Sequence, residues 1–384
     1  MKKIELTILM PCLNEEETIG ICIKKSKDFL KNNKVNGEIL IADNGSTDKS
    51  IAIAKKLGAR IVNVEEKGYG SALIYGCNNA YGKYVIMGDS DDSYDFLHLE
   101  KFLEKLREGY DLVMGNRFKG GIEKGAMPFS HRYIGTPLLS FMGRVFFHSK
   151  IRDFNCGLRG YNKEKIQKLK LSCTGMEYAS EMIVKAELNN LKIAEVPTTL
   201  KKDGRTRKPH LKTFSDGWRH LNFLLVNAPN WLFLIPGLLL FIIGIVGVIL
   251  LFNGKLSVTS DLNLGIHSML YFSSFIIIGF QLCIFYLFAK IYAYKVRIVD
   301  KLNRITNYIM NAPTLKFVLL GIFLIIIGLV LSVVSFLSWK NIKFGNLNSE
   351  IFMPQVIIAN CSIILGLQVF FSAFLINVMN IKHR

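Results

Sequence analysis

The chain has 384 residues, a formal net charge of +18 and 50% hydrophobic residues, most densely in its second half. Residues 229–384 carry 11 Lys and Arg against 3 Asp and Glu, whereas residues 1–228 carry 37 and 27. This contrast predicts a charged globular domain over residues 1–228 and a membrane domain over residues 229–384. Zinc-ligand spacing and RNA-binding signatures are absent. We therefore attribute the basic excess to anionic lipid and phosphate substrates and expect no nucleic-acid partner.

Short apolar runs and helical patterns alternate along the first 115 residues. This alternation is typical of a mainly parallel, Rossmann-like α/β sheet that is covered by helices on both faces. The loops that follow its strands should gather at one edge of the sheet, where nucleotides bind. Strands are expected over residues 4–11, 38–43, 60–64, 84–87 and 111–114, and helices over 15–30, 47–57, 71–81 and 96–107.

An acidic cluster directly follows the strand that is expected over residues 84–87. It contains Asp89, Asp91 and Asp92, and Asp95 follows three residues later. Like charges this close repel one another unless a cation lies among them, and carboxylate oxygens favour a hard ion such as Mg²⁺ or Mn²⁺. The pattern predicts a divalent-metal site for a phosphate-bearing substrate.

Two other interpretations of this cluster compete with a metal site. Asp95 precedes the helical pattern over residues 96–107 and could act only as a helix cap. The acidic spacing also matches an EF-hand loop, but Tyr94 stands where that loop needs Gly, and a strand precedes it. The EF-hand interpretation is therefore disfavoured.

Polar loops also follow the first two strands. Residues 11–15 read PCLNE and residues 43–48 read DNGSTD. Such side chains can hydrogen-bond a base or a ribose, and Gly45 permits a close backbone approach. Simple helix capping is the competing interpretation, by Asn14 with Glu17 and by Ser46 or Thr47 ahead of the next helix. The loops predict a nucleotide site only in combination with the acidic cluster.

Four apolar runs in the second half are each long enough for a membrane-spanning helix of about 20 residues. The connection between the second and third runs, from Lys290 to Lys316, carries six Lys and Arg, and the other two connections carry one and two. The positive-inside rule then places the front domain, this connection and the C-terminus in the cytoplasm. No ionisable residue lies deep inside a run, which favours an anchor over a transporter. The runs cover about residues 231–252, 268–293, 315–339 and 355–378.

The segments MPCLNEEETIG, ADNGSTDKS, KGYGSAL and GDSDD, in this order, resemble glycosyltransferase family 2, whose members have the GT-A fold. The later segments GNRF, FSHRYIG and IRDFNCGLRGYNKE are similar to polyprenyl-phosphate sugar transferases of the dolichol-phosphate mannose or glucose synthase type. The resemblance covers about residues 4–225. It implies a GT-A catalytic domain, a nucleotide-sugar donor, a polyprenyl or dolichyl phosphate acceptor, and Mg²⁺ or Mn²⁺ as the cofactor.

The resemblance also implies roles for individual residues. Asp89 and Asp91 match the DxD pair of the family, with Asp91 as the main metal ligand. Ser93 stands where several relatives carry a Gln that helps to hold the metal. Asp153 and Glu177 would orient the sugar. The nucleotide and its diphosphate would be bound by Pro11, Leu13, Asn14, Glu15, Asp43, Lys67, Gly70, Asp89, Arg205 and Lys208.

Arg117 and Arg132 match the arginines that bind the acceptor phosphate in the family. A guanidinium suits this role because it can hold a phosphate through two parallel hydrogen bonds. The competing interpretation is a pair of surface arginines with no fixed partner. A phosphate monoester carries a charge of about −1.5 to −2 at pH 7, so the acceptor needs little help from a general base.

The composition of two further segments suggests roles at the membrane and at the donor. Residues 128–147 combine arginines with large apolar side chains, so a helix here either lies in the membrane interface or packs against the core. The loop that contains Arg205, Arg207 and Lys208 is expected to close over the donor diphosphate.

The favoured function is inverting transfer of one sugar, from a UDP-glucose or GDP-mannose class donor, to a polyprenyl phosphate at the cytoplasmic face. Inversion is implied by the resemblance alone. A processive polysaccharide synthase is the alternative, although its usual QxxRW signature is absent. A membrane protein that only binds nucleotide sugars is a third reading. The donor, the polyprenol and a homo-oligomeric state stay open.

Overall fold

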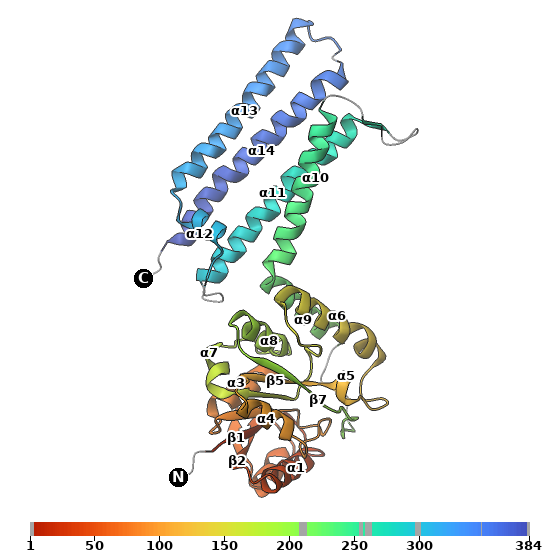
Figure 1. The fold of residues 1–384 in the computed structure, drawn as a ribbon, viewed down its shortest axis with the longest axis vertical. Coiled ribbons are helices and arrows are strands. Elements are labelled where there is room, and N and C mark those ends of the chain that lie inside the picture. Colours follow the sequence, from red (N-terminus) through yellow and green to blue (C-terminus); the bar gives the residue numbers. More distant parts are fainter. Residues whose placement is uncertain are drawn as a thin grey trace. The chain divides into compact units, whose positions relative to one another are not determined.

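The computed structural model describes residues 4–206, 213–252, 256–257, 263–295, 301–346 and 348–381. The chain divides into two compact units, Met1–Asn227 and Ala228–Arg384 (Figure 1). The first unit is an α/β domain and the second is a set of long helices. The tail at residues 382–384, which we predicted to be cytoplasmic, lies outside the described residues.

A seven-stranded sheet forms the centre of the first unit, with the strand order β3-β2-β1-β4-β6-β5-β7. All neighbouring strands are parallel except at β6, which runs antiparallel to β4 and β5. The predicted mainly parallel sheet is therefore confirmed. The strands are β1 (Leu6–Cys12), β2 (Gly37–Asp43), β3 (Arg60–Asn63), β4 (Tyr84–Met87), β5 (Leu112–Asn116), β6 (Arg159–Asn162) and β7 (Ile193–Pro197).

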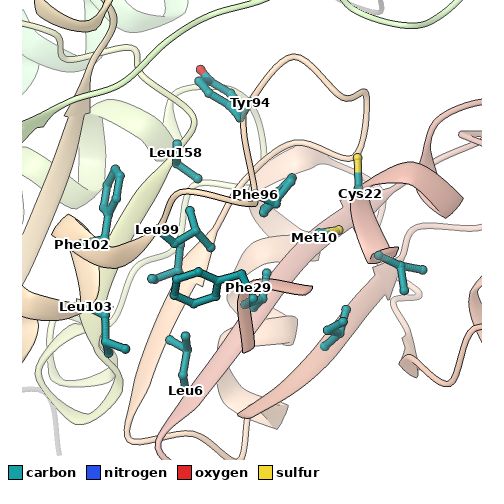
Figure 2. Packing of buried hydrophobic residues seen from close by; sticks show 14 of the residues in the cluster. Leu6, Met10, Cys22, Phe29, Tyr94, Phe96, Leu99, Phe102, Leu103 and Leu158 are labelled. Carbon is teal, nitrogen blue, oxygen red and sulfur yellow. The ribbon is translucent and has the colours of Figure 1, made fainter. Parts of the chain in front are cut away.

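Helices cover both faces of this sheet because its strand residues are apolar on both sides. Ile8 and Met10 pack into one hydrophobic cluster and Leu9 packs into the other. Figure 2 shows the first cluster, with Leu6, Met10 and Phe29 among its labelled side chains. One face carries α1 (Ile19–Asn32), α2 (Ser50–Lys56) and α4 (Glu100–Arg107). The other carries α3 (Tyr69–Asn79), α6 (Thr136–Phe147), α7 (Lys163–Lys168), α8 (Tyr178–Leu188) and α9 (Thr213–Asn227).

Two helices begin four residues later than the periodicity predicts, at Ile19 and Glu100. The residues before α1 are held by other loops, since the backbone N–H of Glu15 donates to Ser50 Oγ at 2.7 Å. Before α4, Asp95 accepts from the backbone N–H of Leu97 at 3.0 Å and closes a turn. The chain at both places forms loops at the sheet edge before it can form a helix.

Among its described residues, the second unit contains four helices that are long and apolar enough to cross a membrane, which confirms the four predicted spans. A short helix, α12, lies between the second and third spans in the sequence, and a two-stranded ribbon of β8 and β9 lies between the first and second. The first span consists of the π-helical turn η2 (Asn230–Leu234) and α10 (Ile235–Leu251). The other elements are β8 (Leu256–Ser257), β9 (Asn263–Leu264), α11 (Ile266–Lys295), α12 (Arg304–Asn311), α13 (Thr314–Asn341) and α14 (Ser349–Asn380).

Glycines allow these long helices to pack closely in pairs. A Cβ atom on Gly237 of α10 would lie 3.0 Å from the backbone oxygen of Gly279 in α11. A Cβ on Gly321 of α13 would lie 2.8 Å from a backbone oxygen of α14. In a membrane, such close backbone approach provides the van der Waals contact that holds helices together. Gln368 of α14 donates a hydrogen bond to Gln281 of α11 at 2.9 Å. Each of these two polar side chains thereby has a hydrogen-bond partner on the other helix.

Candidate active site

The carboxyl ends of β2, β1 and β4 lie side by side, because these strands are parallel neighbours. Cys12 at the end of β1 is in register with Asp43 at the end of β2, and Leu9 is in register with Met87 at the end of β4. The loops that leave the three strands therefore meet at one edge of the sheet, as predicted.

Hydrogen bonds join these loops to one another. The backbone N–H of Asn14 donates to Ser46 Oγ at 3.0 Å, and that of Thr47 donates to Asn14 Oδ1 at 2.7 Å. Thr18 Oγ1 donates to the backbone oxygen of Ser90 at 2.7 Å. Asn14 and Ser46 thus fix the two loops against each other instead of capping helices, and the capping interpretation of these two residues is wrong.

Two of the residues expected at the nucleotide make contacts within the protein. Lys67 Nζ donates to the backbone oxygen of Asn44 at 2.7 Å. The backbone N–H of Gly70 donates to the oxygen of Thr174 at 2.8 Å, and a Cβ on Gly70 would lie 2.1 Å from the oxygen of Cys173. Gly70 therefore lets the segment around residues 173–175 pack directly against the start of α3.

Asp89 occupies a tight polar position just after β4. Its Oδ1 accepts a hydrogen bond from the hydroxyl of Tyr69 at 2.9 Å, and a Cβ on Gly157 would lie 2.6 Å from its Oδ2. Burial raises the pKa of Asp89 to about 6, and the charge of Asp91 adds to this shift. A carboxylate held in this way is stabilised by any cation that enters the site.

Asp91 is buried and is contacted on both of its oxygens. Its Oδ1 accepts from the backbone N–H of Ser93 at 3.0 Å and from the Ser93 hydroxyl at 2.6 Å. Its Oδ2 accepts from Arg205 Nη2 at 2.5 Å. Ser93, which replaces the Gln of several relatives, therefore orients Asp91 through its hydroxyl.

The other two aspartates of the cluster have structural partners. Asp92 pairs with Lys25 Nζ at 2.6 Å. Asp95 pairs with His98 at 2.7 Å in addition to its turn-closing bond to Leu97. Asp95 closes a turn ahead of α4, whose N-cap is Leu99, so the helix-capping interpretation of Asp95 is wrong. Asp89 and Asp91 remain as the pair for a ligand.

The chemistry of this pair fits a divalent cation that is shared with a substrate. In the described part of the chain, no group of three or more His, Cys, Asp or Glu could hold a metal by itself. Asp89 and Asp91 supply hard oxygen donors, and a guanidinium already stands in as a cation on Asp91. Oxygen atoms of a bound diphosphate would have to complete the coordination of Mg²⁺ or Mn²⁺.

Arg117 and Asp153, which we assigned to different substrates, form one buried ion pair. Arg117 Nε and Nη2 each donate to the Asp153 carboxylate at 2.8 Å, and the Arg117 backbone N–H donates to it at 3.1 Å. Arg117 is 8% exposed and Asp153 is fully buried. Two of the three guanidinium nitrogens of Arg117 are thereby occupied.

Arg132 and Glu177 keep unused polar atoms. Arg132 lies in the π-helical turn η1 (His131–Gly135), with its guanidinium 5.6 Å from the ring centre of Tyr133, and it makes no ion pair with the residues that the structure describes. Glu177 Oε2, just before α8, is buried without a hydrogen-bond partner within the described ranges. Lys208 and Arg207 lie outside the described residues.

Sequence reasoning missed Arg159, which is fully buried at the start of β6. Its guanidinium donates to the backbone oxygens of Cys156, Ala179 and Phe154 at 2.9, 2.6 and 3.0 Å. It thereby joins the Asp153 loop to the first turn of α8. The segment NCGLRG was part of the family resemblance, but a sequence does not show which arginine is buried.

The segment over residues 128–147 contains η1 and α6, and it has one face on the core and one face outward. Leu139 and Gly143 are buried, and a Cβ on Gly143 would lie 2.4 Å from the ring of Phe154. The opposite side exposes large apolar side chains. They are Phe129, Tyr133, Ile134, Leu138 and Phe141.

Comparisons with known proteins agree with this architecture. Residues 7–170 match the family model for glycosyl transferase family 2, and residues 287–380 match the model for the glycosyltransferase family 2 C-terminal transmembrane region. The low-salt glycan biosynthesis hexosyltransferase Agl6 of Haloferax volcanii is 34% identical over 373 residues, which cover 97% of this chain and 88% of that protein. The dolichyl-phosphate hexose transferase of the same organism is 29% identical over 56% of this chain and 89% of its own length.

Among solved structures, one that aligns with this chain is the glucosyl-3-phosphoglycerate synthase of Mycobacterium tuberculosis in complex with Mn²⁺, UDP and glucosyl-3-phosphoglycerate. The alignment has a TM-score of 0.48 and 22% sequence identity, and it covers 58% of this chain and 80% of that chain. The two family models and the nearly full-length relative confirm the predicted GT-A domain and the helical membrane domain. The chain belongs to glycosyltransferase family 2 and is an integral membrane glycosyltransferase with the C-terminal transmembrane region of that family.

Proposed function

We propose that this enzyme transfers one hexose, with inversion, from a nucleotide diphosphate sugar to polyprenyl or dolichyl phosphate at the cytoplasmic face of the membrane. The observation that carries the proposal is the Asp89 and Asp91 pair in a chain that also has four membrane-spanning helices. The relatives named as a hexosyltransferase and as a dolichyl-phosphate hexose transferase support it.

In the proposed reaction, a phosphate oxygen of the acceptor forms a bond to the anomeric carbon of the sugar. The bond from that carbon to the β-phosphate oxygen of the donor breaks, and a nucleoside diphosphate leaves. The acceptor phosphate is already ionised, with a charge of about −1.5 to −2 at pH 7, so no residue has to remove a proton.

Asp89 and Asp91 would hold Mg²⁺ or Mn²⁺, and the ion would neutralise charge on the leaving diphosphate. The nucleotide would lie against the loops that leave β1 and β2. Arg205 and Lys208 would contact the diphosphate. The nucleotide contacts we propose come from Pro11, Leu13, Asn14, Glu15, Asp43 and Lys67.

The acceptor phosphate would be bound by Arg132 and by the remaining nitrogen of Arg117, which Asp153 holds in place. Glu177 Oε2, which has no hydrogen-bond partner among the described residues, would accept a hydrogen bond from a sugar hydroxyl. The exposed apolar face of η1 and α6 would rest on the bilayer surface, where a polyprenyl phosphate presents its charge.

The test incubates membranes that contain the protein with a panel of labelled UDP- and GDP-sugars. One label should move into the organic-soluble lipid fraction as a single sugar per lipid, and Asp91→Asn should reduce this transfer by about 10²-fold or more. Asp92→Asn is the matched control, because Asp92 pairs with Lys25 and Asn tolerates its positive φ of 62°. Label that stays water-soluble, or that enters a polymer, would refute the proposal.

A further inference from the structure

Arg205 bridges the two loops that would hold the donor and the metal. Its Nη2 donates to Asp91 Oδ2 at 2.5 Å and its Nη1 donates to Glu15 Oε1 at 3.0 Å. Asp203 Oδ2 lies 3.2 Å from its Nε. The charges of Asp91 and Glu15 raise the pKa of Arg205 above its usual value although burial alone would lower it. One guanidinium therefore pairs with three carboxylates at this edge of the sheet and compensates part of their negative charge.

The backbone around Arg205 is fastened to the same loops, and we call residues 201–206 the strap. The backbone N–H of Lys201 donates to the oxygen of Ser93, and that of Gly204 donates to the oxygen of Asp91, both at 2.9 Å. At the far end, Thr206 donates to Glu17 from its backbone N–H at 2.8 Å and from its hydroxyl at 2.6 Å. These bonds fasten the strap over Asp91.

We propose that Arg205 is a built-in counter-ion that blocks Asp91 until donor and metal arrive together. The proposal rests on the proposed function in taking Asp91 as a metal ligand. Mg²⁺ binds a carboxylate oxygen at about 2.0–2.1 Å, so an ion on Asp91 Oδ2 would lie close to the guanidinium that pairs with the same oxygen at 2.5 Å. Repulsion between the two cations disfavours binding of the ion while Arg205 stays in place. We expect Arg205 to move away from Asp91 when the ion binds there.

The exchange predicts that metal and nucleotide bind cooperatively. A metal ion alone has to displace Arg205 and leaves the guanidinium without its main anion. A metal bound to a diphosphate brings a new anion for Arg205, so the displacement costs less. The apparent affinity for the metal alone is reduced by the fraction of molecules with an open strap, which is about tenfold if one molecule in ten is open. The site would thus be held inactive towards free metal.

The test measures Mn²⁺ binding to the full-length, detergent-solubilised protein by electron paramagnetic resonance, with and without UDP. In Arg205→Gln, the affinity for Mn²⁺ without nucleotide should rise by about tenfold, and the gain in Mn²⁺ affinity caused by UDP should shrink. Lys202→Ala is the control, because it removes the same charge from the strap at an exposed position, and it should leave the affinity within about twofold.

A second variant opens the strap without touching the metal pair. Glu17→Gln weakens the bonds to Thr206, so the affinity for Mn²⁺ alone should rise, by less than in Arg205→Gln. Equal Mn²⁺ affinity in the wild type and Arg205→Gln, including undetectable binding by both, would overturn the inference. If the variants show the expected Mn²⁺ affinities but the enzyme labels no lipid, the result counts against the proposed acceptor. The binding measurement involves no lipid substrate, so it tests the inference about Arg205 separately.

Discussion

Arg117 and Asp153 form a buried, bidentate ion pair. Nε and Nη2 of Arg117 each lie 2.8 Å from an oxygen of the Asp153 carboxylate. The two residues come from different motifs, one after β5 and one in the loop before β6. Their pairing means that neither can be altered without leaving a buried charge unpaired. The role of Asp153 is therefore to position Arg117, in addition to any contact it makes with substrate.

Asp153→Asn should destabilise the first unit strongly. Breaking a buried pair leaves an uncompensated charge, which costs about 3–5 kcal/mol. Glu5 and Arg107 form the matched exposed pair, with distances of 2.7 and 2.9 Å, and Glu5→Gln should cost at most about 1 kcal/mol. Chemical unfolding of both variants in detergent gives the comparison. Similar losses of unfolding free energy in the two variants would show that burial does not control the strength of the Arg117 pair.

Metal should stabilise the protein in a pH-dependent way. Because burial and Asp91 raise the pKa of Asp89 from 3.8 to about 6, protonated Asp89 stabilises the metal-free fold at low pH, and this contribution is lost as the pH rises through about 6. A bound cation favours the carboxylate and reverses that loss. Mn²⁺ should therefore raise Tm more at about pH 7.5 than at about pH 5.5.

The matched variant for this experiment is Asp89→Asn, which keeps the shape of the side chain and removes its titration. In this variant the Tm of the metal-free protein should lose its dependence on pH around 6. The Mn²⁺-induced rise in Tm should become small at both pH values. A rise in Tm that is larger at the lower pH would contradict the assignment of Asp89 as a metal ligand.

Gly70→Ala should disrupt the junction between α3 and the segment at residues 173–175. The added Cβ would lie 2.1 Å from the backbone oxygen of Cys173 and 2.9 Å from Tyr178 Cβ, so the backbone has to shift, at a cost of about 1–3 kcal/mol. Gly217→Ala in α9 is the control, since none of the described atoms lies within 4 Å of its added Cβ and Ala favours a helix. A Tm that is unchanged in Gly70→Ala would show that this junction yields easily.

The outward face of η1 and α6 should matter for the lipid substrate alone. Phe141 is 55% exposed, and burying a Phe side chain contributes roughly 1.5–3 kcal/mol, so Phe141→Asp should raise KM for the polyprenyl phosphate by about tenfold or more. KM for the nucleotide sugar should stay unchanged. Tyr75→Asp, at a 46% exposed position on α3, is the control and should alter neither value. Equal effects of the two variants would place the bilayer contact elsewhere.

Local patterns were enough to predict β1 to β5, the four spans and the acidic cluster after β4, but neither β6 nor β7. The run over β4 is continuously apolar and the acidic residues follow it at once, so the position of the proposed metal pair needs no long-range information. The strand β6 escaped prediction because it is four residues long and begins with Arg159, a residue type that is normally exposed. Hydrogen bonds to three backbone oxygens replace the water that its guanidinium loses on burial.

The sequence by itself determined the fold class, the division into a catalytic and a membrane half, and the family, because periodicity, hydropathy and ordered motifs are local properties of the chain. The tertiary structure decided which charges meet. Arg205 lies 114 residues from Asp91 in the sequence, and Arg117 lies 36 from Asp153. Contacts between such distant residues follow from how the strands and loops are packed, and charge pairing at a site is set by distances in space that no local pattern contains.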